Sequence, residues 1–186
     1  KIRQDWLNEE ANFCIEELGF YRIAVSSPKI SLADVDSNLK LHLQEIKKAE
    51  KDGANLILFP QLSITGASLG SVFKQSILIE KAFDAVRLIA GKTKQFSILS
   101  VVGLPFLYRE RLYTCSAVIS SGKLIALVPH LPSKLLCSIF SDFEDAPCLI
   151  PLCGENIPFG KEFKFIGNCK DSCGLNKGFS FYFDSS

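Results

Sequence analysis

The 186-residue sequence contains no methionine and only two histidines, His42 and His130. Neither histidine has a neighbouring pattern of metal ligands, and no two cysteines have Cys-x-x-Cys spacing, so nothing in the sequence indicates a zinc site. We accordingly expect no metal and no other cofactor. Because the sequence opens on Lys1 and has no methionine, we also expect that the native start, or residues in a modified form, lie outside it.

The sequence also lacks a charge bias, a basic run and a long apolar run. Its 21 Lys and Arg against 20 Asp and Glu give a formal net charge of +1, which favours neither nucleic acid nor an anionic membrane as a partner. The longest apolar stretch, residues 96–108, is interrupted by serine, glycine and proline and is too short to span a bilayer. No signal peptide is recognisable at the start. We therefore expect a protein of the cytoplasm or another reducing soluble compartment.

Composition is that of a folded globular protein. Hydrophobic residues make up 47% of the sequence and charged residues 22%, and a chain of this length is expected to form one domain with a substantial core. The seven cysteines are odd in number and irregularly spaced, which does not indicate a disulfide framework. Cys14 and Cys115 lie within apolar patterns and are predicted to be small buried residues.

Apolar periodicity predicts an α/β protein. An amphipathic helix over residues 4–18, ended by Gly19, is expected to form an N-terminal extension. The expected elements that follow are a strand over 20–26, a helix from Asp34 to about Asp52, a buried strand over 56–59, a helix over 71–90, a strand over 96–103, hairpin strands over 111–120 and 123–128, and a late strand over 179–183. We expect a long loop over 131–148. His42 lies off the centre of its helix's apolar stripe, so it is expected in solvent or at the edge of the core.

The most informative stretch is residues 55–66, which read N-L-I-L-F-P-Q-L-S-I-T-G. The continuous apolar run from Leu56 to Phe59, stopped by Pro60, is typical of a strand buried on both faces. Gln61 then lies in the loop at the carboxyl end of that strand, where sheets layered with helices bind their ligands. A primary amide cannot take up a proton near neutral pH, whereas a carboxylate there could.

This stretch resembles the first catalytic motif of the nitrilase, or carbon-nitrogen hydrolase, superfamily, most closely the amidase domain of bacterial glutamine-dependent NAD synthetases. In that family the loop reads F-P-E-L-S-x-T-G, and its Glu is the general base of a Glu-Lys-Cys triad. Further segments resemble the same domain in the same order: V-V-G-L-P at 101–105, R-L-Y-x-C at 111–115, V-P at 128–129 and I-P-F-G from Ile157.

The resemblance implies a fold and a domain organisation. We expect half of a nitrilase-type αββα sandwich with a mixed sheet that has a largely parallel core. The nitrilase-like domain is expected over residues 20–186, after an N-terminal helical extension over 1–19. Its C-terminal part is expected to be incomplete, so that either a missing portion or a partner covers the sheet edge.

The family's three catalytic positions are all altered in this sequence. By resemblance, Gln61 stands at the base position, His130 at the lysine position, and Asp184 at the cysteine position, with Tyr182 where the preceding Glu belongs. A neutral imidazole does not supply the fixed positive charge of a lysine. Gln61 keeps the shape of Glu but cannot accept a proton.

Alternatives exist at two of these positions. Lys134 could supply the cation if the loop after residue 129 follows a different course. Cys169 or Cys173 could be the nucleophile, although both are expected in a loop rather than on a strand, and nothing near them in sequence would lower the pKa of a thiol.

Together these substitutions predict a degenerate, inactive carbon-nitrogen hydrolase domain with a structural or protein-binding role, in a homo-oligomer or with a protein partner. One alternative is an active glutamine amidase that supplies ammonia for NAD synthesis. A second is a non-catalytic domain that binds a small amide such as a glutamine-like ligand. The sequence contains no P-loop and no nucleotide-binding fingerprint, so the ATP-using half of such a synthetase is not expected in it.

Overall fold

The computed structural model of the chain describes residues 21–152, 154–170 and 176–184. Its elements, in chain order, are β1 (Ile23–Val25), α1 (Val35–Lys51), β2 (Leu56–Leu58), the 3-10 helix η3 (Gly70–Lys74), α2 (Ser76–Lys92), β3 (Leu99–Tyr108), β4 (Arg111–Ser120), β5 (Lys123–His130), β6 (Cys148–Leu152), β7 (Glu155–Phe159), β8 (Glu162–Lys170) and β9 (Asn176–Asp184). The helix predicted over residues 4–18, together with Cys14 and Cys173, lies outside the described residues.

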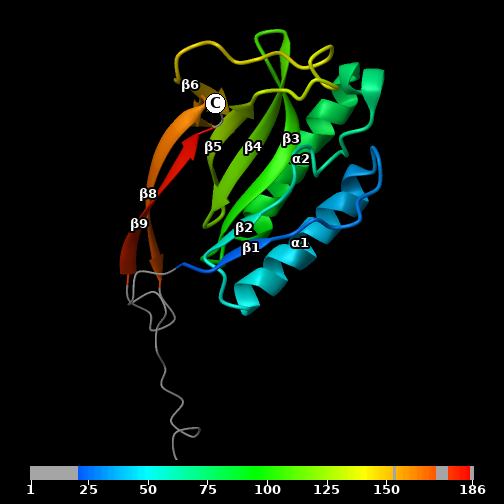
Figure 1. The fold of residues 1–186 in the computed structure, drawn as a ribbon. Coiled ribbons are helices and arrows are strands. Elements are labelled where there is room, and N and C mark those ends of the chain that lie inside the picture. The colour runs from blue at the N-terminus through cyan, green and yellow to red at the C-terminus, as the bar shows by residue number, and fades with distance from the viewer. Residues whose placement is uncertain (1–20, 153, 171–175, 185–186) are drawn as a thin grey trace, which may run out of the picture.

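Seven strands form one mixed sheet in the order β1-β2-β3-β4-β5-β7-β6. The pairs β1–β2, β2–β3 and β5–β7 are parallel, and the pairs β3–β4, β4–β5 and β6–β7 are antiparallel. The strands β8 and β9 pair with each other as a separate antiparallel hairpin, drawn in orange and red in Figure 1. The predicted α/β class and mixed sheet are therefore confirmed.

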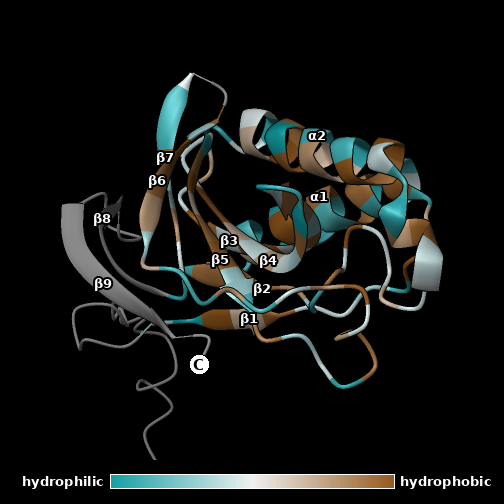
Figure 2. Cartoon of the chain, turned by 90° about the horizontal axis from the view of Figure 1, so that it is seen from above, coloured by the Kyte–Doolittle hydropathy of each residue, from teal (hydrophilic) through white to brown (hydrophobic). Residues whose placement is uncertain are grey.

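Both long helices cover the same face of the sheet, as Figure 2 shows. Asp34 begins α1 as predicted, since its carboxylate accepts a hydrogen bond from the backbone N–H of Ser37 at 3.1 Å. The predicted second helix is instead divided at Gln75, whose extended backbone separates η3 from α2. The helix α2 also continues one residue past Gly91, which was expected to end it.

His42 is completely buried, so the expectation of a solvated or edge position is wrong. Its Nδ1 donates to the carbonyl of Asn38 at 2.7 Å, its Nε2 lies 2.9 Å from Ser63 Oγ, and its ring lies 4.3 Å from that of Phe59. The Asn38 side chain, also completely buried, bonds the backbone at Ser31 and donates to the carbonyl of Ile64 at 3.0 Å. Through these hydrogen bonds, Asn38 and His42 connect α1 to the loop that follows β2.

That loop crosses directly over strand β3 at Gly103. A Cβ atom on Gly103 would collide with the carbonyl oxygen of Pro60 and lie 2.5 Å from the backbone nitrogen of Leu62. The amide of Ile64 donates to the Gly103 carbonyl at 3.1 Å, which fixes the crossing. Leu62 adopts a positive φ of 55° at the centre of the turn, and its side chain is fully buried. The absence of a side chain at Gly103 thus allows the loop to present Gln61.

The face of the sheet opposite the helices is apolar as well. Its buried members are Leu56, Leu99, Val101, Val118, Ala126 and Val128. At the edge strand β1, Ile23 pairs with Leu56 and Val25 with Leu58, so both side chains belong to this face. Ile23 is 53% exposed and Val25 is 78% exposed. The buried strand predicted over 56–59 is confirmed, because apolar residues lie on both of its faces.

A β-bulge interrupts the pairing of β4 with β5. Ile119 pairs with Leu124, but the next residue back along β4, Val118, pairs with Ala126, so Ile125 is the extra residue. Beyond the bulge, Ser116 pairs with Val128 and Thr114 with His130. His130 therefore shares a face of the sheet with Thr114 and Ser116.

We predict that Gly103→Ala destabilises the protein by about 1–3 kcal/mol, because the new methyl group must displace backbone rather than a flexible side chain. Urea unfolding of the two proteins measures the change. Gly91→Ala in α2 is the matched control, since open space surrounds that position, and it should stabilise by up to about 1 kcal/mol. Equal stability of Gly103→Ala and wild type would contradict the crossing described above.

We predict that the buried His42 makes folding stability fall in mild acid. Desolvation by burial lowers its pKa from 6.5, so above that pH both states are neutral, and below it the unfolded chain binds a proton that the folded chain does not. The contribution is at most about 1.4 kcal/mol per pH unit. The free energy of unfolding, measured with urea at several pH values between about 7 and about 5, should fall less steeply with decreasing pH for His42→Gln than for wild type. Identical slopes would show that His42 is not buried in its neutral form.

Candidate functional site

Gln61 and His130, which are distant in sequence, meet on the face of the sheet opposite the helices. The side-chain amide of Gln61 donates from Nε2 to Thr114 Oγ1 at 2.9 Å. The Thr114 hydroxyl in turn lies 3.4 Å from the backbone carbonyl of His130, to which it donates. Strand β4 therefore links the loop after β2 to the end of β5.

The imidazole of His130 has a partner of its own on β4. Ser116 Oγ lies 2.6 Å from His130 Nε2. Phe59, Gln61, Ser116, His130 and Leu131 together line an open depression of about 380 Å³. Gln61 and His130, the residues predicted for the family's base and lysine positions, thus line one depression.

The electrostatic character of this depression differs from that of a charged catalytic centre. Desolvation by burial lowers the pKa of His130 below 6.5, so its ring is neutral near pH 7. The described residues that line the depression include no lysine, arginine, aspartate or glutamate. The site can donate and accept hydrogen bonds, but it does not offer a fixed charge.

Lys134, the alternative cation, lies in the turn that follows β5. The backbone amide of Cys137 donates to the carbonyl of Ser133 at 3.0 Å and closes that turn around Lys134. Lys134 is exposed and is not among the described residues that line the depression.

The residue predicted for the nucleophile position, Asp184, lies on the hairpin of β8 and β9. Asp184 is the last residue of β9 and pairs with Glu162, the first residue of β8. The strand predicted over 179–183 is thus confirmed and is longer than expected. Cys169 lies on β8, paired with Lys177 near the other end of the hairpin, so its expected place in a loop is wrong. The assignment of Asp184 to the cysteine position stays a prediction.

Sequence reasoning missed Thr114 and Ser116. The signal that could have revealed them is their spacing, because two hydroxyl residues two apart on a buried strand must point to the same face. In the strand sequence L-Y-T-C-S-A-V-I, Thr114 and Ser116 are the only residues with a hydroxyl group apart from Tyr113, and the other residues are apolar. Thr114 is fully buried and Ser116 is 9% exposed.

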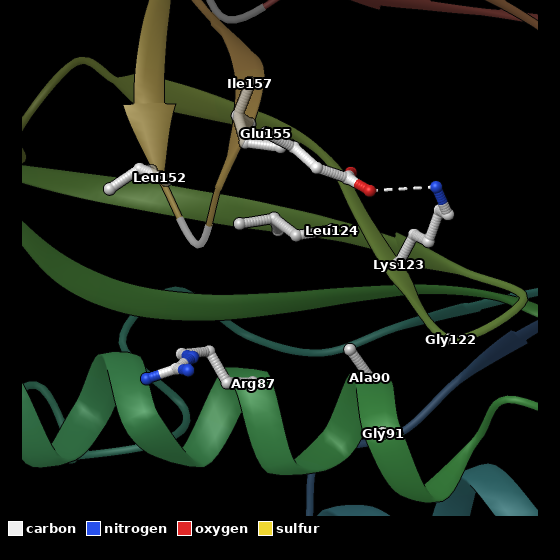
Figure 3. A pocket seen from close by; sticks show the side chains of 9 residues that line it. All are labelled: Arg87, Ala90, Gly91, Gly122, Lys123, Leu124, Leu152, Glu155 and Ile157. Carbon is white, nitrogen blue, oxygen red and sulfur yellow. Dashed lines mark hydrogen bonds and ion pairs between the residues drawn. The ribbon is translucent and has the colours of Figure 1, made fainter.

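A second cavity, of about 250 Å³, lies between α2 and the strands β5 to β7 on the helix-covered side (Figure 3). Its charged groups are already paired: Lys123 Nζ lies 2.9 Å from Glu155 Oε1, and Arg87 lies 3.2 Å from Asp84. Its remaining lining is largely aliphatic, from Ala90, Leu124, Leu152 and Ile157. The described residues that line it include no serine, cysteine or histidine.

Among the described residues, no group of three or more His, Cys, Asp or Glu is placed to hold a metal ion. No described helix is long and apolar enough to cross a membrane.

Comparison with known proteins places the chain in a family. The sequence profile named carbon-nitrogen hydrolase matches residues 22–131. A glutamine-dependent NAD(+) synthetase from Mycobacterium bovis is 30% identical over 155 residues, which cover 81% of this chain and 23% of that protein. One from Aquifex aeolicus is 26% identical over 147 residues, which cover 74% of this chain and 24% of that protein. The chain thus spans under a quarter of the length of either relative.

Solved structures show the same fold. A glutamine-dependent NAD(+) synthetase from Cytophaga hutchinsonii matches with a TM-score of 0.72 at 19% identity, covering 78% of this chain and 26% of that chain. An amidase from Nesterenkonia sp. matches with a TM-score of 0.58 at 22% identity, covering 74% of this chain and 54% of that chain. From the matched profile, the relatives and the motif around Gln61, the chain belongs to the carbon-nitrogen hydrolase family.

Proposed function

We propose that this carbon-nitrogen hydrolase domain, related to the glutaminase domain of NAD synthetase, does not hydrolyse amides and instead has a structural, protein-binding role in an assembly. The observation that carries the proposal is the hydrogen bond from Gln61 Nε2 to Thr114 Oγ1. In this bond the side chain predicted for the family's base position acts as a donor, whereas general-base catalysis requires a group that accepts a proton.

The second support is that the described residues around Gln61 offer no fixed charge. Amide hydrolysis develops negative charge on the carbonyl oxygen, which a lysine at the position of His130 would stabilise. The lowered pKa of His130 leaves a neutral ring there instead. Its Nε2 is already engaged with Ser116 Oγ at 2.6 Å. Neutral, hydrogen-bonded groups at the two positions that the resemblance assigns to the base and the lysine therefore support the proposal.

The protein-binding role rests on the sheet face around β1. Ile23 and Val25 project from an edge strand of three residues and are mostly exposed, although the same face is apolar and buried from β2 to β5. An exposed apolar edge of this kind is stabilised when another protein surface covers it. We propose a second copy of this chain as the first partner to test.

The relatives support one competing function. Their names describe glutamine-dependent NAD(+) synthetases, so an active glutamine amidase that supplies ammonia for NAD synthesis is the alternative. It requires a thiol nucleophile, for which Cys169 and Cys173 are the candidates, and a base other than Gln61. A non-catalytic site for a small amide is a further candidate, because the depression beside Gln61 offers neutral donors and acceptors.

We predict that neither wild type nor Gln61→Glu releases ammonia from glutamine above the rate of a protein-free control. A restored carboxylate alone does not replace the missing cation and thiol. If the base were the only missing group, Gln61→Glu would raise ammonia release by about 10²-fold or more. A coupled ammonia assay measures both proteins, and Gln61→Leu controls for the loss of the bond to Thr114. Ammonia release by wild type would favour the amidase.

We predict that Val25→Lys weakens self-association about tenfold or more, because assembly would bury an unpaired charge. Light scattering over a concentration series measures the dissociation constant. Leu135→Lys is the matched control, since Leu135 is 89% exposed and lies in the loop after β5 rather than on β1. A wild type that remains monomeric at every concentration, or equal effects of the two substitutions, would contradict a second copy as the partner.

A further inference from the structure

We propose that Ser116 and His130 form a nucleophile and base pair that transfers acyl groups from small activated carboxylic esters. The inference goes beyond the proposed function, which concerns amide hydrolysis by a thiol and the binding of a protein partner. It rests on the 2.6 Å contact between Ser116 Oγ and His130 Nε2 and on their position in the wall of the depression beside Gln61.

The pair is held by regular sheet structure. Ser116 lies on β4, which pairs with β3 on one side and β5 on the other, opposite Gly103 and Val128 respectively. His130 is the last residue of β5 and pairs with Thr114, so Ser116 and His130 are diagonal neighbours on one face. Because both residues belong to ordered strands, their contact does not depend on a loop closing.

The protonation state suits a base. Burial keeps the His130 ring neutral near pH 7, so in the tautomer protonated at Nδ1 the Nε2 atom can accept the Ser116 proton. As Ser116 Oγ bonds to the ester carbonyl carbon, its proton passes to Nε2. The ester C–O bond then breaks, the leaving oxygen takes the proton from Nε2, and the acyl group stays on Ser116 until water hydrolyses it by the same proton path.

Gln61 supplies a donor for the oxygen that becomes negative. Its side-chain amide has two N–H groups, one of which bonds to Thr114 Oγ1. The other N–H has no further partner among the described residues, and Gln61 lines the depression together with Ser116. A preorganised amide donor of this kind stabilises an oxyanion. Phe59 and Leu131 provide apolar walls for the acyl group.

The same contacts select the substrate class. In the described part of the chain, no carboxylate hydrogen-bonds to the His130 ring, so nothing stabilises the imidazolium as the aspartate of a serine hydrolase triad does. Without that partner the pair cannot readily expel an amine. Esters with a good leaving group, such as a phenolate, need less assistance, and they are the expected substrates.

The test uses the purified chain with p-nitrophenyl acetate and a serine-reactive fluorophosphonate. We expect nitrophenolate release and a single covalent adduct, located on Ser116 by mass spectrometry of peptides. Ser116→Ala should abolish the adduct, and His130→Gln should slow acylation about 10²-fold, the usual contribution of a general base. Ser120→Ala, at the far end of the same strand, is the matched control and should behave as wild type.

Three outcomes would overturn the inference: no adduct on wild type, an adduct that persists in Ser116→Ala, or equal acylation rates for wild type and His130→Gln. Circular dichroism of each variant shows whether it is folded. If Ser116→Ala unfolds, the acylation rate of His130→Gln and the position of the adduct on wild type still test the inference. The acylation rate should also fall only below pH 6.5, since protonation of His130 removes the base. Ammonia release from glutamine is a separate readout, so failure here leaves the proposed function unaffected.

Discussion

The close approach of the loop after β2 to Gly103 is the constraint on which the rest of the site depends. The backbone of Pro60 and Leu62 occupies the space that a side chain at residue 103 would fill. With the loop in that place, the Gln61 amide reaches Thr114 on the strand beyond β3. From the other side, Asn38 and His42 on α1 bond to the loop at Ile64 and Ser63. The loop is therefore fixed both by the helix layer and by the sheet.

This arrangement accommodates a glutamine after Pro60 without a charged partner for it among the described residues. The loop position is determined by backbone contacts and buried amide and imidazole groups, none of which requires an acidic residue at position 61. A glutamine fits because one N–H of its amide finds a hydroxyl acceptor on Thr114. His130 similarly finds Ser116. The four polar side chains thus form two hydrogen-bonded pairs, Gln61 with Thr114 and His130 with Ser116.

Much of the fold could be predicted from the sequence, because local patterns dictated it. The apolar run that ends at Pro60 identified β2, and Asp34 identified the start of α1. His42 was misplaced because helical periodicity does not reveal that Ser63 and Asn38 can satisfy a buried imidazole. The contact between Ser116 and His130 was missed for another reason. The contact depends on the register between β4 and β5. Tertiary packing determines that register, and the length of the turn between the two strands does not predict it.

The bulge at Ile125 has a wider consequence for how this strand pair tolerates insertions and deletions. Since side chains alternate between the two faces along a strand, one extra residue moves every later side chain to the opposite face. In this chain that inversion directs Leu127 into the helix-covered core and Val128 to the other face. Related chains that lack the extra residue would need the opposite alternation of small, polar and aliphatic residues from here to the strand's end. The bulge therefore determines which hydroxyls and rings of β4 and β5 can face one another.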